Sequence, residues 1–226
     1  MAENLEKKNT VSAKGQVMEH VEHEGKADGS PRIMFVGNSI TRHEPAPKIG
    51  WNHNHGMAAS SRERDYVHTV IREVQKKHPD AAFCTVQAGV WEMNYTSCNY
   101  DEYFAKAKDF HPDIIITAIG ANIKADAFTH DDFVREMGLL HSYLSGGKAP
   151  VLIQSGSFFN NLAKTEAIKD YLKGCGGEFV DISDISADER NLAIGLFEHK
   201  GVAMHPGDRG MAMIAERFLS VLDKYI

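Results

Sequence analysis

Cysteine is scarce in this chain of 226 residues, which has only Cys84, Cys98 and Cys175. Their number is odd and no two form a C-x-x-C pair, so the pattern excludes a disulfide framework and predicts free thiols. Residues 1–8 are charged and lack the apolar core of a secretory signal. We therefore expect a cytoplasmic protein, unless a signal segment was removed from its beginning.

Long apolar runs and clusters of basic residues are also missing. No segment is apolar for long enough to cross a bilayer, so we expect no membrane partner. The net charge is -6, which argues against a nucleic-acid partner held by phosphate contacts. The length suffices for one α/β domain with a sizeable core. We expect this domain to cover residues 31–226, behind a polar N-terminal arm of residues 1–30.

The most informative stretch is residues 33–41. Four apolar residues run directly into Gly37, Asn38 and Ser39, a pattern typical of a strand buried on both faces. The glycine allows a sharp turn at the carboxyl end of the strand, where α/β sheets bind ligands. A serine held there, near free backbone N–H groups, is a candidate nucleophile. The alternative is a polar turn or a helix cap.

Short apolar runs alternate with helical patterns along the rest of the chain. Strands are predicted near residues 33–36, 82–86, 113–119, 151–154 and 178–181. Between and after them, helices are predicted from Ser60 or Ser61 to about 77, and near residues 100–110, 131–144, 161–173 and 208–222. This alternation predicts an α/β fold with a central, mostly parallel five-stranded sheet and helices on both faces. The arm is expected to add an edge strand or a short helix, or to pack on a second subunit of a homo-oligomer.

Right-handed crossovers place the carboxyl ends of parallel strands at one edge of the sheet. Ser39, Gly89 and Asn122 each follow a predicted strand, so we expect them to meet at that edge. Two tryptophans and a carboxylate lie close to the same segments. We expect Trp51, Trp91 and Glu92 to contact substrate, with burial of Trp91 in the core as the alternative.

His53 and His55 form a His-x-His pair in the irregular segment 43–57. A metal site needs further ligands at matched spacing, and none is apparent. We therefore expect solvated loop histidines, with no metal and no cofactor.

Four short blocks occur in one order along residues 31–226. They are Gly37-Asn38-Ser39, the turn glycine Gly89, Gly120-Ala121-Asn122, and His205-Pro206. Together they resemble the SGNH hydrolase family, also called GDSL-type esterases. The resemblance implies a flavodoxin-like three-layer α/β/α sandwich and hydrolysis of esters, often acetyl esters on carbohydrates. By position it implies that Ser39 is the nucleophile and His205 the general base. The oxyanion donors would be the Asn122 side chain and the backbone N–H groups of Gly89 and Ser39.

The chain departs from the family pattern at the third member of the triad. The family commonly has Asp three residues before the histidine, where this chain has Val202. A replacement must hold the imidazole in its working tautomer. The candidates are Glu198, the carbonyl of Val202, or a residue from elsewhere. Asp208 opens the last helix and is expected to be its N-cap.

The sequence leaves several functions open. The leading one is a serine esterase acting on a small-molecule or glycan ester of a small acyl group, an acetyl ester. The same site would also serve an acyltransferase. The missing acid favours instead a non-catalytic relative that binds a carbohydrate or another ligand. A nucleotide- or flavin-binding protein of flavodoxin type is the remaining class.

Overall fold

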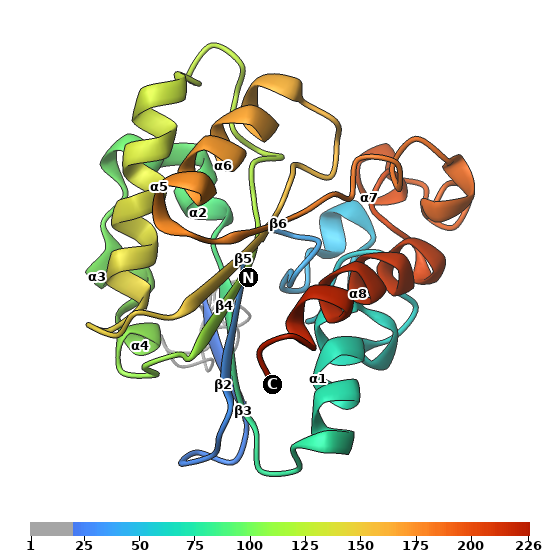
Figure 1. Cartoon of the computed structure of the whole chain (residues 1–226). Coiled ribbons are helices and arrows are strands. Elements are labelled where there is room, and N and C mark those ends of the chain that lie inside the picture. Colours follow the sequence, from blue (N-terminus) through green and yellow to red (C-terminus); the bar gives the residue numbers. More distant parts are fainter. Residues whose placement is uncertain (1–19) are drawn as a thin grey trace, which may run out of the picture.

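A six-stranded sheet forms the centre of the computed structural model, which describes residues 20–226 (Figure 1). Its strands lie in the order β1-β3-β2-β4-β5-β6. All neighbouring pairs are parallel except β1 with β3, which is antiparallel. The strands are β1 (Val21–Gly25), β2 (Arg32–Gly37), β3 (Ala82–Gln87), β4 (Ile114–Ala118), β5 (Val151–Ser155) and β6 (Glu178–Val180).

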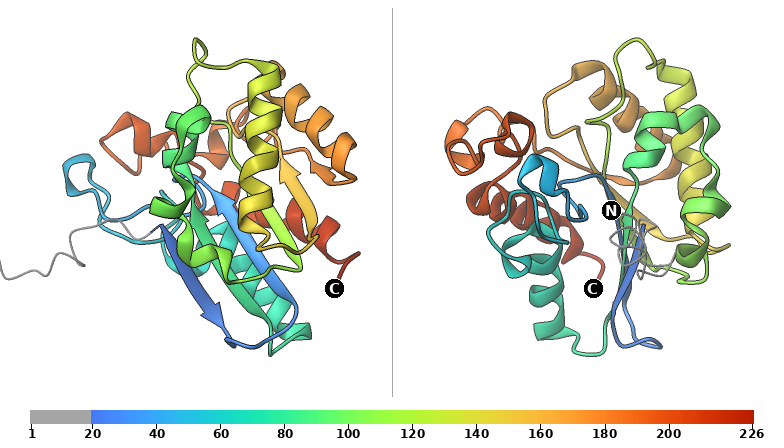
Figure 2. Two further views of the ribbon diagram at one scale, coloured as in Figure 1. Left: turned by 90° about the vertical axis from the view of Figure 1, so that its left-hand side faces the viewer. Right: turned by 180° about the vertical axis from the view of Figure 1, so that it is seen from behind.

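Helices cover both faces of the sheet (Figures 1 and 2). Helices α1 (Tyr66–Lys77) and α8 (Asp208–Leu222) pack together on one face. The opposite face carries α5 (His130–Leu144) and α6 (Leu162–Cys175), which also contact each other. The shorter helices are α2 (Gly89–Asn94), α3 (Tyr100–Tyr103), α4 (Ala105–Lys108) and α7 (Lys200–Ala203). Single 3-10 turns lie at Pro47–Ile49, Arg62–Arg64, Tyr95–Ser97 and Glu189–Asn191.

Strand β2 lies between two hydrophobic cores. Ile33 and Phe35 belong to the cluster under α1 and α8, whereas Met34 and Val36 belong to the cluster under α5 and α6. All four side chains are fully buried. Alternate side chains of a strand point to opposite faces, so an unbroken apolar run is what a strand covered by helices on both sides requires. The predicted doubly buried strand is confirmed.

The predicted α/β sandwich is confirmed, with one more strand than expected. The five predicted strands are β2 to β6, and β1 adds an antiparallel edge strand beside β3. The last part of the predicted arm therefore completes the sheet. The rest of that arm, residues 1–19, lies outside the described residues.

Some predicted helix boundaries were wrong. Helix α1 begins at Tyr66 and not at Ser60 or Ser61, because Asp65 caps it by accepting from the N–H of His68. The N–H and Oγ of Ser60 instead donate to the carboxylate of Asp208. Asp208 therefore does not cap α8, whose N-cap is Gly207.

Two further differences lie between β3 and β4. The helix predicted over residues 100–110 is divided at Phe104 into α3 and α4. Helix α2 follows β3 directly, where the sequence suggested only a turn.

The strand order fixes where a site is expected. Without β1, the order β3-β2-β4-β5-β6 is that of flavodoxin-like sheets. The chain leaves β2 toward β3 on one side and returns to β4 on the other. Ligands bind at the carboxyl ends of the two strands that flank such a reversal. Ser39 follows β2 and Asn122 follows β4, so both lie at this point.

None of the helices in residues 20–226 is both long and apolar enough to span a membrane.

Candidate active site

The turn that carries Ser39 is held by its own backbone. The N–H groups of Thr41 and Arg42 both donate to the carbonyl of Asn38, and the side chain of Asn38 accepts from the N–H of Ile40. A Cβ on Gly37 would overlap the hydroxyl of Thr41, so the close approach of these residues requires glycine. The carbonyl of Ser39 accepts from the N–H of Met57 at 2.8 Å. Ser39 is thus fixed at the end of β2.

Ser39 and His205 meet at this edge although they are 166 residues apart. The Oγ of Ser39 lies 2.7 Å from Nε2 of His205. Ser39 and His205 are both half-buried, so the pair is not closed off from solvent. A serine and an imidazole within hydrogen-bond reach are the arrangement that nucleophilic catalysis requires.

The other nitrogen of His205 is held by a backbone carbonyl. Nδ1 lies 2.7 Å from the carbonyl oxygen of Gly201. A carbonyl only accepts, so Nδ1 carries the proton and Nε2 is left to accept from the hydroxyl of Ser39. The contact therefore fixes the imidazole tautomer that a general base needs.

Both named candidates for this orienting contact were wrong. Glu198 is exposed, and Nδ1 of His205 contacts Gly201 instead. The carbonyl of Val202 accepts from the backbone N–H of His205, at 3.0 Å, and not from the ring. The reason is helical geometry, because Gly201 lies in α7 and the last carbonyls of a helix have no partner within it. His205, four residues on, satisfies one of them.

Burial governs the charge of His205. Removal from water lowers the pKa of the ring, and the positive potential of His43 lowers it further, against the opposing effect of the hydrogen bond to Gly201. His205 is consequently neutral over a wider pH range than an exposed histidine, as a general base must be.

Two of the predicted oxyanion donors keep a free N–H. The backbone N–H of Ser39 has no acceptor among the residues that the structure describes. Asn122 is exposed and uses one hydrogen of its Nδ2 group to donate to Glu92, at 2.6 Å. The second hydrogen of that group remains available. Glu92 also accepts from Nδ2 of Asn38, so it links the residue before Ser39 to Asn122.

Gly89 does not offer a free donor in this structure. Its N–H donates to Oε1 of Gln87 at 3.0 Å, and both residues are buried. The prediction that Gly89 supplies an oxyanion N–H is therefore not met here. Gly89 is the first residue of α2, and the side chain of Gln87 lies beside its N–H. The sequence pattern does not reveal this rotamer of Gln87.

The three predicted substrate contacts are buried. Trp51 packs in a small cluster with Met57 and Val202, and its Nε1 donates to the carbonyl of His43. Trp91 lies in the core under α5 and α6. Glu92 is 1% exposed and faces inward. None of these side chains reaches the surface, so the prediction that they contact substrate was wrong, and the core alternative holds for Trp91.

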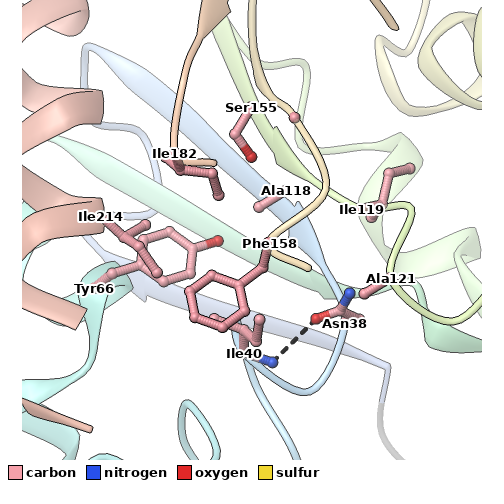
Figure 3. Close-up of a pocket in the computed structure, with 11 residues that line it drawn as sticks. Asn38, Ile40, Tyr66, Ala118, Ile119, Ala121, Ser155, Phe158, Ile182 and Ile214 are labelled. Atoms are coloured by element: carbon pink, nitrogen blue, oxygen red, sulfur yellow. Dashed lines mark hydrogen bonds between the residues drawn. The ribbon is translucent and has the colours of Figure 1, made fainter. Parts of the chain in front are cut away.

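A small pocket lies behind the Ser39 turn, between the sheet and helices α1 and α8 (Figure 3). Its walls are mostly apolar and come from the β2, β4 and β5 loops and both helices. Its volume is about 10 Å³, roughly the space of one water molecule. Such a space does not admit an acyl chain.

A larger groove lies at the surface, between the loop that follows Ser39 and the segment that leads into α7. It has a volume of about 560 Å³ and is lined by residues 47–50 and 196–199. The second segment continues directly into Gly201. Glu198, the rejected partner of His205, lines this groove beside Phe197.

No three side chains of His, Cys, Asp or Glu within residues 20–226 are grouped so that they could hold a metal ion. His53 and His55 stack on each other and pack against Trp51. Cys84, Cys98 and Cys175 are free thiols.

Two residues of the site were not anticipated. Gly201 holds His205, and the only sequence signal for it was a short helical segment ending just before a histidine. Lys164 is 5% exposed and donates to the carbonyls of Gly120 and Ile123, at 2.7 and 2.5 Å. A lysine in a helix otherwise indicates a solvated position, so nothing in the sequence pointed to this contact.

Comparisons with known proteins place this fold. No family model and no curated protein matches the sequence. Among solved structures, a two-domain esterase active on acetylated mannans aligns with a TM-score of 0.55 at 19% identity, over 85% of this chain and 49% of that protein. A family two carbohydrate esterase from Clostridium thermocellum aligns with a TM-score of 0.59 at 15% identity, over 87% and 64%. A putative GDSL-like lipase from Bacteroides ovatus aligns with a TM-score of 0.55 at 14% identity, over 86% of this chain and 98% of that protein.

The chain thus spans about half of the mannan esterase and slightly under two thirds of the carbohydrate esterase. At these identities the likeness shows the fold. The fold is the α/β/α sandwich of GDSL-type lipases and carbohydrate esterases, and the resemblance to SGNH hydrolases predicted from the four sequence blocks is confirmed at that level.

Proposed function

We propose that this chain is a serine esterase that removes a small acyl group, an acetyl group, from a carbohydrate ester. The observation that carries the proposal is the 2.7 Å contact between Ser39 Oγ and His205 Nε2. It lies at the reversal of strand order in the sheet, where ligands bind. A hydroxyl that only caps a turn does not need an imidazole whose second nitrogen is also tied, to Gly201.

In the proposed reaction, Ser39 attacks the ester carbonyl while Nε2 of His205 takes its proton. The negative charge that develops on the carbonyl oxygen is stabilised by the N–H of Ser39 and the amide of Asn122. As the intermediate collapses, His205 returns the proton to the leaving alcohol. Water then attacks the acyl-serine with the same proton transfers in the same order. Gly201 keeps Nδ1 protonated throughout.

The acetyl group follows from the resemblance to SGNH hydrolases, and one feature of the structure supports a sugar alcohol. The open groove beside the site has both apolar and charged walls, among them Phe197, Lys48 and Glu198. Sugars present apolar faces and hydroxyl edges, so such a groove suits them. Structures of the same fold include an esterase active on acetylated mannans.

The proposal is tested by labelling and by substrate length. A fluorophosphonate should add its mass to Ser39, and Ser39→Ala should abolish both labelling and turnover of 4-nitrophenyl acetate. Ser97→Ala, which changes an exposed serine, serves as the matched control and should leave both unchanged. Rates should fall steeply from acetate to butyrate and be negligible for octanoate. Acetylated mannan oligosaccharides should release acetate.

Labelling at another residue, or wild-type turnover by Ser39→Ala, would overturn the assignment of the nucleophile. A preference for octanoate would contradict the small acyl group and indicate a lipase. Binding of the oligosaccharide without release of acetate would favour a non-catalytic carbohydrate-binding protein.

A further inference from the structure

Glu92 gathers four donors from two separate strand ends. Its carboxylate accepts from the backbone N–H of Gly120, from the N–H of Asn122 at 3.4 Å and from Nδ2 of Asn122 at 2.6 Å. It also accepts from Nδ2 of Asn38 at 3.3 Å. Asn38 follows β2, whereas Gly120 and Asn122 follow β4. One side chain on α2 therefore joins the serine turn to the oxyanion loop.

The surroundings of Glu92 suit a carboxylate. Four hydrogen bonds are donated to the two oxygens of Glu92, and a carboxylate, which only accepts, can receive all of them. Burial raises the pKa of Glu92 above its ordinary value, although the four donated hydrogen bonds oppose that effect. The ammonium of Lys164 interacts with the Glu92 charge. A buried ionic group is retained only where its hydrogen bonds are satisfied, and here they are.

Lys164 holds the same loop from the other side. Its Nζ donates to the carbonyls of Gly120 and Ile123, while Glu92 takes the N–H groups of Gly120 and Asn122. Gly120 has a φ of 119°, a conformation that side chains rarely adopt. The loop therefore keeps an unusual backbone between an anion from α2 and a cation from α6.

The contact decides which way the Asn122 amide points. A carboxylate cannot donate, so the nitrogen and not the oxygen of the amide must face Glu92. Nδ2 has two hydrogens, and only one of them is used by Glu92. Asn122 is otherwise an exposed loop residue, whose amide would be free to rotate and to present its oxygen to the substrate. Stabilisation of an oxyanion depends on donors that are fixed before the reaction.

We propose that Glu92 is a positioning residue of the oxyanion hole, which fixes the donor face of Asn122 toward the reacting ester through its buried contact. This role rests on the proposed esterase function. The sequence predicted that Glu92 contacts substrate, and the positioning role takes the place of that contact. Glu92 is buried beneath the loop of Gly120 and Asn122 that it holds.

A double-mutant cycle tests the role. Glu92→Gln keeps the shape but turns one accepting oxygen into a donor, so Asn122 either loses its partner or flips. We expect kcat on 4-nitrophenyl acetate to fall at least tenfold with little change in KM, as for Asn122→Ala, whose expected loss is about a hundredfold. Because Glu92 acts through Asn122, the double variant should lie within about threefold of Asn122→Ala alone.

The matched control is Glu136→Gln. Glu136 is also a buried carboxylate, but it lies on α5 and pairs with Arg135. It should keep the wild-type kcat. An unchanged kcat in Glu92→Gln would overturn the positioning role of Glu92, and so would a double variant whose loss is the product of the two single losses. In either case, turnover that depends on Ser39 would still support the proposed esterase function. Equal turnover by wild type and Ser39→Ala would overturn both.

A measurement on the unmodified protein covers the case in which Glu92→Gln does not fold. In an amide NMR spectrum, the side-chain NH₂ pair of Asn122, assigned by its loss in Asn122→Ala, should show one proton shifted far downfield and slow to exchange. The other proton should exchange quickly. Two fast-exchanging protons at ordinary shifts would overturn the role, because no carboxylate contact would then hold the amide.

Discussion

The imidazole of His205 is held at both nitrogens, by Ser39 on one side and by Gly201 on the other. A carbonyl can fix the tautomer as a carboxylate does, but it carries no full charge to stabilise the imidazolium. In the proposed esterase, Ser39 and His205 therefore act as a dyad, with a backbone acceptor in place of the third residue. The carbonyl of Gly201 holds the tautomer that an acid at the position of Val202 would otherwise hold.

The first prediction at the residue scale concerns Glu198. Because Glu198 is exposed and lies in the groove and not at Nδ1, Glu198→Gln should change kcat on 4-nitrophenyl acetate by less than about twofold. His205→Ala should lower kcat by about 10³ or more, since it removes the proposed general base. A loss of several orders of magnitude in Glu198→Gln would show that a carboxylate orients the ring during turnover.

The second prediction follows from the burial of His205. Burial lowers the pKa of the ring, and the proposed general base works only when it is neutral. Activity is thus retained as pH falls through 6.5, the ordinary value for histidine, and is lost only as pH passes the lower pKa of the folded protein. The acid limb of kcat/KM, which reports the free enzyme, should therefore lie below pH 6.5. A limb at or above 6.5 would contradict this. His43→Gln removes an opposing charge and should move the limb upward.

At this scale the sequence was sufficient for residues whose role follows from local pattern. The place of Ser39 could be predicted because an apolar strand followed by a glycine specifies a tight turn at the end of that strand. Gly201 could not, because its carbonyl reaches His205 only through the end of a four-residue helix. The state of the Gly89 N–H could not be predicted either, since the rotamer of Gln87 decides whether that N–H is free.

Among the secondary-structure elements, α1 is tied to the site through its N-cap. The carboxylate of Asp65 accepts from the N–H of His68 at 2.7 Å and from the N–H of Gly56 at 3.0 Å. Asp65 is fully buried. The residue after Gly56 donates to the carbonyl of Ser39. The start of helix α1, the loop 43–57 and Ser39 are thus connected by three hydrogen bonds.

We predict that Asp65→Ala destabilises the protein more than loss of an ordinary cap. A cap typically contributes about 1 kcal/mol. Besides the capped N–H, the N–H of Gly56 in a buried loop and Nδ1 of His68 would also lose their acceptor. We expect the free energy of unfolding to fall by about 2–4 kcal/mol in urea denaturation. Thr129→Ala, which removes the exposed cap of α5, should cost about 1 kcal/mol or less. Equal losses in the two variants would contradict the argument.

The start of α1 shows why element boundaries were harder to predict than elements. Ser60 and Glu63 match the capping-box pattern, yet the helix begins at Tyr66. Ser60 is taken by Asp208, a residue 148 positions away. Such a contact depends on how α8 packs beside α1, and no local pattern records it. Strands β2, β3 and β4 were predicted well because each is a largely apolar run that is buried on both faces.

On the scale of the whole molecule, an ionic network attaches the edge strand β1 to the domain. Arg62 contacts Glu22 and Glu24 of β1, at 2.7 and 2.9 Å. Nε2 of His68 lies 3.2 Å from Glu24, and its Nδ1 lies 2.7 Å from Asp65. The strand that the sequence pattern did not specify is thus held by charges as well as by its ladder with β3.

This network should make stability depend on pH. Burial acts to lower the pKa of His68, but hydrogen bonds to Asp65 and Glu24 outweigh it and raise the pKa to about 9. Burial likewise acts to raise the pKa of Glu24, but His68 and Arg62 outweigh it and lower the pKa to about 2. The contribution of Glu24 is present above its ordinary pKa and is lost as pH falls through about 2. Both groups are charged between these limits.

The contribution of His68 has the opposite sign. Its folded pKa is raised, so its stabilisation is fully present below about pH 6.5, the unfolded value, and is lost as pH rises through about 9. In this window the folded state binds one proton more than the unfolded state, so the free energy of unfolding should fall by up to about 1.4 kcal/mol per pH unit. Urea denaturation between pH 6 and 9.5 measures that slope. His68→Gln should remove the part of this slope that is due to His68. The control is His130→Gln, which changes an exposed histidine paired with Asp131 and Asp170. It should keep the wild-type slope, because solvent screens its ion pairs. If His68→Gln and wild type lost stability in parallel over this range, the charge of His68 would have no part in holding β1 to the domain.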